Sequence, residues 1–133
     1  WLPSDAKVFE RGMQLLHRCD GEFKQLLDRY KYPKQHGLED GTGARNEALF
    51  FLANLESLLT QQRYLFNSNI GIFDAAILPF IRQFSHVDID WFAAQPLPSV
   101  QAWLSAFEHS ADFKRAMTVY PAWADNSPIT VFP

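Results

Sequence analysis

The sequence predicts an all-α fold, a bundle of helices packed around one buried central helix. Two long stretches carry apolar residues every three to four positions, from near Asp5 to Tyr32 and from Thr42 or Ala44 to about Gln62. A third stretch, residues 70–84, is apolar on every face of a helical wheel, so other helices must surround its first turns. With 133 residues and 47% hydrophobic content, the chain can form one domain, residues 1–133, with its own core.

The first helix is expected to begin near Asp5, where the Ser4 side chain can cap it. Its apolar stripe continues across Asp20 and Gly21, which predicts one long helix with a kink at that point. The helix should end at Tyr32, because a residue that precedes a proline is disfavoured in the α region.

Residues 33–43 contain three glycines among mostly polar neighbours, which is typical of a surface loop. The second long helix follows and should lie against the first. Its predicted apolar face consists of Ala48, Phe51, Leu52, Leu55, Leu58 and Leu59. Residues 64–66 then form a short apolar segment before a turn.

The central helix has a predicted structural cap formed by Gly71 and Asp74. Asp74 lies three residues after Gly71, so its carboxylate can reach back to the first free backbone N–H, and the positive end of the helix dipole favours its charge. Pro79 removes one backbone donor and is expected to bend the helix.

The remaining segments predict shorter elements. Residues 87–92 read as a short amphipathic turn, and a helix with an apolar face starts at Pro96. That face consists of Val100, Trp103, Leu104 and Phe107. Ser110 should cap a last short helix to about Met117, followed by an irregular tail over residues 120–133 laid across the helices.

Composition excludes several classes of function. A net charge of −3 without a cationic cluster argues against nucleic acid as a partner. The longest apolar stretch has roughly a dozen residues, short of the ~20 that span a bilayer, so no membrane partner is expected. A lone cysteine indicates a cytoplasmic protein without disulfides, and the four histidines lack metal-ligand spacing, so no metal site is predicted. A start without Met or a signal peptide suggests a cut inside a longer chain.

Several spaced motifs, in the same order, resemble the C-terminal domain of cytosolic glutathione transferases. Gly-Ile-Phe-Asp-Ala-Ala-Ile-Leu-Pro-Phe at residues 71–80 resembles the capping box and hydrophobic staple of that family's central helix. The Pro-x-Pro-x-x-x-x-Trp-Leu segment at 96–104 and Ser-Ala-Asp-Phe at 110–113 match the helices that follow. Residues 20–24 and 27–33 resemble a bacterial subgroup of glutathione transferase-like proteins. Gly71 departs from the family, which usually has Ser or Thr there, although glycine remains an acceptable cap.

The resemblance implies a glutathione transferase C-terminal-like helical bundle that is the second half of an enzyme. In that family the glutathione site and the thiol-activating residue lie on an N-terminal thioredoxin-like domain, and this chain has no strand pattern of that kind. The chain is therefore expected to have no catalytic residue and to be inactive alone. It would supply the wall for a small hydrophobic electrophile and part of a homodimer interface, with glutathione as co-substrate of the parent transferase. The alternative is a non-enzymatic helical module for protein–protein interaction.

The candidate substrate-binding residues are Met13, Asp20, Tyr30, Tyr120 and Trp123. Asp20 faces the expected cleft and could hold a substrate ammonium group or the amino group of glutathione; the alternative is a carboxylate that caps the kinked helix. The aromatic residues could line an apolar pocket between the first helix and the tail, or could simply pack in the core.

Two further polar residues have structural interpretations. Cys19 lies on the apolar stripe without a supporting base, which predicts a buried structural thiol and not a nucleophile. Arg82, on a largely buried helix, should form an ion pair, with Asp88 or Asp90 as its nearest partners in the sequence.

Overall fold

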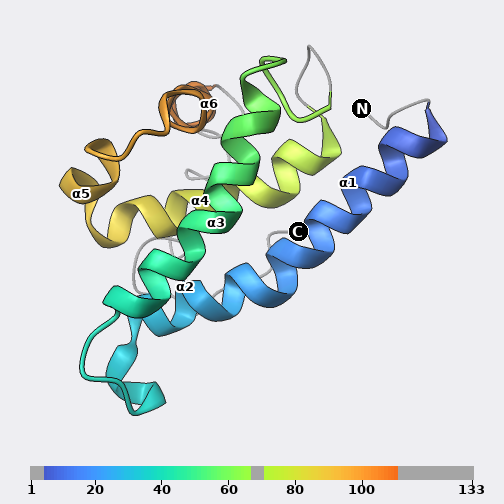
Figure 1. The fold of residues 1–133 in the computed structure, drawn as a ribbon. Coiled ribbons are helices and arrows are strands. Elements are labelled where there is room, and N and C mark those ends of the chain that lie inside the picture. Colours follow the sequence, from blue (N-terminus) through green and yellow to red (C-terminus); the bar gives the residue numbers. More distant parts are fainter. Residues whose placement is uncertain (1–4, 67–70, 111–133) are drawn as a thin grey trace.

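The computed structural model describes residues 5–66 and 71–110, and this part of the chain is an all-α bundle (Figure 1). Its elements, in chain order, are α1 (Ala6–Arg18), the π-helical turn η1 (Cys19–Phe23), α2 (Lys24–Lys31), the 3-10 turn η2 (Pro33–His36), α3 (Thr42–Leu59), α4 (Ile72–Val87), α5 (Ile89–Ala93) and α6 (Pro98–Glu108). The predicted all-α class is confirmed. Tyr120, Trp123 and the predicted last helix lie outside the described residues.

Helices α1 and α2 form one rod that is continuous through η1, as the unbroken apolar stripe predicts (Figure 1). The N-cap is Asp5 and not Ser4: the Asp5 side chain accepts a hydrogen bond of 2.8 Å from the backbone N–H of Lys7. The predicted kink at Asp20 is a π-helical turn, in which the backbone N–H of Lys24 reaches the carbonyl oxygen of Cys19. The rod ends at Lys31, immediately before Tyr32 and Pro33, as expected.

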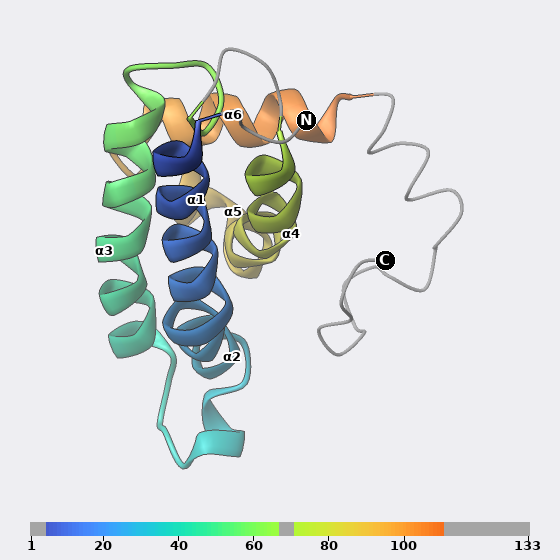
Figure 2. The same ribbon diagram turned by 90° about the vertical axis from the view of Figure 1, so that its right-hand side faces the viewer.

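Helix α3 runs back along the rod and packs on α2 (Figures 1 and 2). It ends at Leu59, three residues before the predicted end. Helix α6 crosses the top of the bundle and packs on α3 and α4 (Figure 2). The first turn of α6 is held by Glu56 of α3, whose carboxylate accepts hydrogen bonds of 3.0 Å from the Ser99 N–H and 2.9 Å from the Val100 N–H.

Helix α4 is the predicted buried central helix. It packs against α1, α2, α5 and α6, and no residue from Gly71 to Ser85 is exposed. Its buried residues are Phe73, Asp74, Ile77, Leu78, Ile81, Phe84 and Ser85. Pro79 lies inside the helix, which continues to Val87. The buried residues share one side of α4, and the residues on its other side, between Ile72 and Gln83, are half-buried.

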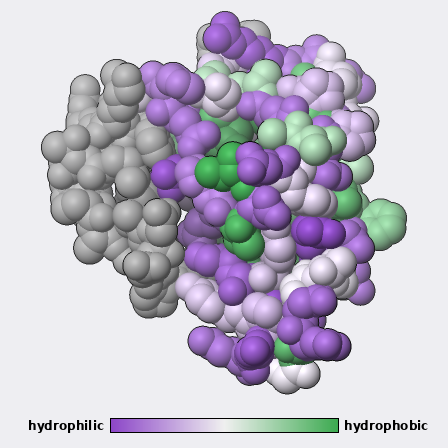
Figure 3. All heavy atoms as spheres, turned by 90° about the vertical axis from the view of Figure 1, so that its left-hand side faces the viewer, coloured by the Kyte–Doolittle hydropathy of each residue, from purple (hydrophilic) through white to green (hydrophobic). Residues whose placement is uncertain are grey.

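The outer surface of the bundle carries both hydrophilic and hydrophobic residues. The face in Figure 3 is largely hydrophilic, and its hydrophobic residues occur as separate small groups. Within residues 5–66 and 71–110, no helix combines the length and apolar character needed to cross a bilayer.

Candidate functional site

The predicted substrate-binding residues on the first rod occupy different environments. Met13 on α1 is 44% exposed, and Asp20 on η1 is also exposed. Helical periodicity places Phe9, which is 40% exposed, on the same flank as Met13 and Asp20. We call Phe9, Met13 and Asp20 the rod flank. It combines two accessible apolar side chains with one carboxylate.

The π-helical turn gives this flank its distinctive local geometry. The five residues Cys19–Phe23 have π-helical geometry. Space is open beside Gly21, since a Cβ added there would contact nothing within 4 Å. Such turns are uncommon inside α-helices and frequently occur at functional sites. The sequence predicts a kink at this position but not its kind. The structure therefore adds a reason to keep Asp20 as a candidate.

Tyr30 has a core environment, which is the alternative that the sequence also allows. It is 9% exposed, and its ring centroid lies 5.1 Å from that of Phe84 and 6.4 Å from that of Trp91. The guanidinium of Arg45 lies 4.3 Å from the Trp91 ring centroid, within the range of a cation–π contact. Burial raises the pKa of Tyr30, while the charge of Arg45 opposes that rise. Tyr30 is therefore not on the rod flank with Met13 and Asp20.

Cys19 is the buried thiol that its place on the apolar stripe predicts. Its side chain is 0% exposed. Burial, assisted by the negative charge of Asp20, raises the pKa of Cys19 to about 12. The reactive form of cysteine is the thiolate, so this group is a poor nucleophile at neutral pH.

Asp74 is the polar centre of the core. It is 0% exposed, and its carboxylate accepts three hydrogen bonds of 2.9 Å, from the backbone N–H groups of Gly71 and Leu65 and from the indole N–H of Trp103. Burial raises the pKa of Asp74, and these hydrogen bonds oppose the rise. Of the two hydrogen bonds of a capping box, only the one from the Gly71 N–H to the Asp74 carboxylate is formed, because glycine has no side chain to accept the other. The hydrogen bond from the Gly71 N–H to Asp74 is the contact that the three-residue spacing predicts.

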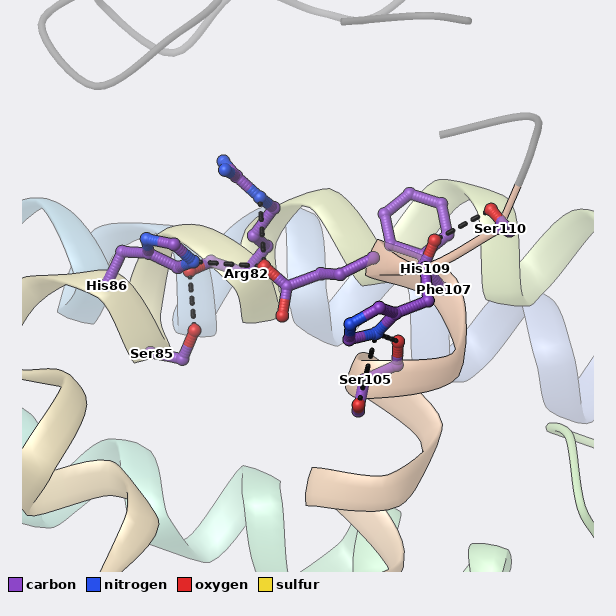
Figure 4. A network of polar contacts seen from close by, with 8 residues as sticks. Arg82, Ser85, His86, Ser105, Phe107, His109 and Ser110 are labelled. Carbon is purple, nitrogen blue, oxygen red and sulfur yellow. Dashed lines mark hydrogen bonds and ion pairs between the residues drawn. The ribbon is translucent and has the colours of Figure 1, made fainter. Parts of the chain in front are cut away.

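A second polar group joins α4 to the end of α6 (Figure 4). Glu108 Oε2 lies 3.3 Å from Arg82 Nε and 3.0 Å from His86 Nε2. The expected pairing of Arg82 with Asp88 or Asp90 is wrong, because Asp88 instead caps α5 by accepting a hydrogen bond from the Trp91 N–H. These contacts tie two helices together, and the described residues contain no group of side chains suited to a metal ion.

Comparisons of this chain with protein-family models, with curated proteins and with solved structures give no match. The class that the structure itself defines is a small all-helical bundle with a buried central helix. Within it, the rod flank is the surface at which two of the predicted substrate-binding residues, Met13 and Asp20, coincide with the unusual backbone geometry of η1.

Proposed function

We propose that this chain is the helical domain of a glutathione transferase-like protein. In this proposal the glutathione site lies on a thioredoxin-like domain outside the chain. The helical domain supplies the wall for a small hydrophobic electrophile and part of a homodimer interface. The chain alone performs no catalysis.

One observation carries the proposal: the two strongest motifs of the resemblance meet at Asp74. Asp74 belongs to the motif at residues 71–80, and Trp103 belongs to the motif at 96–104. The Trp103 indole N–H donates a 2.9 Å hydrogen bond to Asp74 Oδ1 in the buried core. Two motifs that are far apart in the sequence thus contribute to the same buried hydrogen bond. A chance agreement of two short patterns would not require such a contact.

The rod flank suits the role of a co-substrate wall. Phe9 and Met13 offer accessible apolar area, and such area favours binding of apolar groups. Asp20, about two turns beyond Met13, offers a carboxylate that could hold an ammonium group, such as the amino group of glutathione.

Calorimetry tests where the glutathione site lies. Titration of glutathione into the 133-residue chain is expected to give no binding heat, because the site belongs to the other domain. The coding sequence immediately upstream is expected to encode a thioredoxin-like domain, and the two domains together should bind glutathione. Tight binding by the helical chain alone would contradict the proposal.

Kinetics of the two-domain protein test the wall. Met13→Ser should raise KM for an apolar electrophile by about 3- to 10-fold, since a loss of roughly 1 kcal/mol of apolar contact is tenfold or less in affinity. Gln14→Ser is the matched control, because Gln14 is also exposed on α1 but points away from the rod flank. Equal effects of both substitutions would remove Met13 from the wall.

The alternative function, a non-enzymatic interaction module, is favoured by a different observation: Phe50 on α3 is 79% exposed. A stoichiometric complex with a folded partner protein, formed without glutathione and lost on Phe50→Ser, would support this alternative.

A further inference from the structure

Three side chains meet at a corner of the bundle where the end of α2 lies beside the start of α3 (Figure 1). They are Tyr30 of α2, Arg45 of α3 and Trp91 of α5, and we call them the α2–α3–α5 corner. The Arg45 guanidinium lies 4.3 Å from the Trp91 ring centroid, and the ring centroids of Tyr30 and Trp91 are 6.4 Å apart. Tyr30 is buried, whereas Arg45 and Trp91 are half-buried, so the corner is accessible from solvent.

Two hydrogen-bond donors at this corner have no acceptor in the described part of the chain. The hydroxyl group of Tyr30 and Nε of Arg45 are both buried, and neither forms a hydrogen bond. The two groups are neighbours: burial raises the pKa of Tyr30, and the nearby charge of Arg45 opposes the rise. They cannot satisfy each other, because a guanidinium has no acceptor atom for the hydroxyl hydrogen. Since buried donors without an acceptor are unfavourable, an oxygen atom that accepts from both would be stabilised here.

Arg45 also lacks an ionic partner. Among the residues that the structure describes, it forms no ion pair. Two exposed carboxylates are near, since the charge of Arg45 acts on Asp40 and the charge of Asp88 acts on Tyr30. Each of them caps a helix, α3 for Asp40 and α5 for Asp88. Stacking on Trp91 uses the face of the guanidinium, so its N–H edge can still donate two parallel hydrogen bonds to a carboxylate.

We propose that the α2–α3–α5 corner binds the carboxylate group of a small-molecule ligand. One carboxylate oxygen accepts from Arg45 Nε and from the Tyr30 hydroxyl, and the other accepts from the terminal nitrogen on the same edge of the guanidinium. A carboxylate fits better than a phosphate, because its single charge is repelled less by Asp40 and Asp88. The site is separate from the rod flank and does not depend on the proposed function.

Titration of the 133-residue chain with sodium acetate at constant ionic strength, followed by proton–nitrogen NMR, tests the site. The Arg45 Nε–H signal is identified by its loss in Arg45→Gln. This signal and the Trp91 indole signal should shift to saturation, with a dissociation constant on the order of 1–10 mM for so small a ligand. The Arg18 Nε–H is the matched control, because its exposed guanidinium also stacks on a ring, 5.7 Å from the Phe51 centroid. It should show no saturable shift.

Variants separate the contributions of the two donors. Tyr30→Phe removes only a hydroxyl group that forms no hydrogen bond, so it should not lower the melting temperature, but it should raise the dissociation constant for acetate about 3- to 10-fold. Arg45→Gln should abolish the saturable shift at Trp91, whereas Arg18→Gln, which removes the same charge, should leave it unchanged. Asp88→Asn should lower the dissociation constant about 2- to 3-fold, because it removes a repelling charge and its amide oxygen can still cap α5.

Several results would overturn the proposal. They are a shift no greater at Arg45 than at Arg18, an affinity that Tyr30→Phe leaves unchanged, and equally tight binding of neutral acetamide or inorganic phosphate. Binding that appears only in Asp88→Asn would show that Asp88 fills the corner in the native protein, and it would overturn the proposal as well. Millimolar affinity is far below the tight glutathione binding that would contradict the proposed function, so the two proposals can fail separately.

Discussion

Asp74 combines a buried carboxylate with three hydrogen-bond donors from three different segments. Asp74→Ala would leave those donors buried without an acceptor, and each such group costs about 1–3 kcal/mol. We expect a loss of about 3 kcal/mol or more in the free energy of unfolding, measured by urea denaturation.

Asp28→Ala is the matched control for Asp74. Asp28 Oδ2 lies 2.8 Å from His36 Nε2, but both side chains are substantially exposed. Exposed pairs of this kind contribute less than about 1 kcal/mol. Similar losses for the two variants would show that burial does not give Asp74 its importance.

Cys19 should make stability fall with rising pH in the alkaline range. The thiol of the unfolded chain ionises near its ordinary pKa of 9.0, whereas burial raises the pKa of Cys19 in the folded chain to about 12. Between these values the unfolded state binds fewer protons, so each rise in pH favours unfolding, by up to about 1.4 kcal/mol per pH unit. Below pH 9 this contribution to stability is fully present.

The Cys19→Ala variant isolates that contribution, because it has no thiol to ionise. The difference in unfolding free energy between wild type and variant, from urea denaturation, should change by about 1.4 kcal/mol in the variant's favour from pH 8 to pH 10. A difference independent of pH would indicate that the folded thiol ionises normally.

Residue environments could be predicted from the sequence where they depend on local spacing. The burial of Cys19 follows from its place on an apolar stripe, and the cap at Asp74 follows from its distance to Gly71. The partner of Arg82 could not be predicted, because Glu108 approaches it from another helix. The indole donor to Asp74 likewise comes from α6 and has no local signal.

At the scale of elements, the contact between α1 and α4 depends on a glycine. A Cβ added at Gly12 would lie 2.1 Å from Cε2 of the buried Phe73 ring. Gly12→Ala should therefore destabilise the protein by about 1–3 kcal/mol, although alanine is the better helix former by up to about 1 kcal/mol. Thermal unfolding measures the change.

Gly21→Ala on η1 serves as the matched control for Gly12. Its added methyl group would contact nothing within 4 Å, so only the gain in helix propensity remains. We expect an unchanged or slightly raised melting temperature. An equally harmless Gly12→Ala would show that α1 and α4 can move apart at this contact without a loss of stability.

Helix positions could be predicted closely because an apolar stripe repeats over many residues. The rod, α3 and α4 each lie within a few residues of their predicted bounds. The π-helical form of η1 could not be predicted, since five residues, Cys19–Phe23, are too few to separate its period from that of an α-helix.

At the scale of the whole molecule, the buried central helix could be predicted because its apolar residues leave no polar face. The order in which other helices surround it depends on contacts between distant segments, such as α6 with α3, and periodicity contains no information on these. Of the predicted substrate-binding residues, the structure describes Met13, Asp20 and Tyr30. Met13 and Asp20 share an exposed flank of the rod. Tyr30 lies on the side of the rod that faces the core, where its ring packs against Phe84.

Hydrogen exchange tests whether this central helix is also the most stable part of the molecule. Ile77, Leu78 and Ile81 are 0% exposed in the middle of α4, so their amide groups should exchange only through global unfolding. The Phe9 amide, whose N–H donates to the Asp5 carbonyl at 3.0 Å, lies in the exposed first turn of α1 and can open by local fraying. We expect it to exchange at least about 100-fold faster than the α4 amides. The Gly12→Ala variant should reduce protection against exchange by the same factor at these three α4 amides, because the bundle unfolds as one cooperative unit that loses stability as a whole. Protection in α4 no greater than at Phe9 would show that the surrounding helices do not stabilise the centre of the bundle.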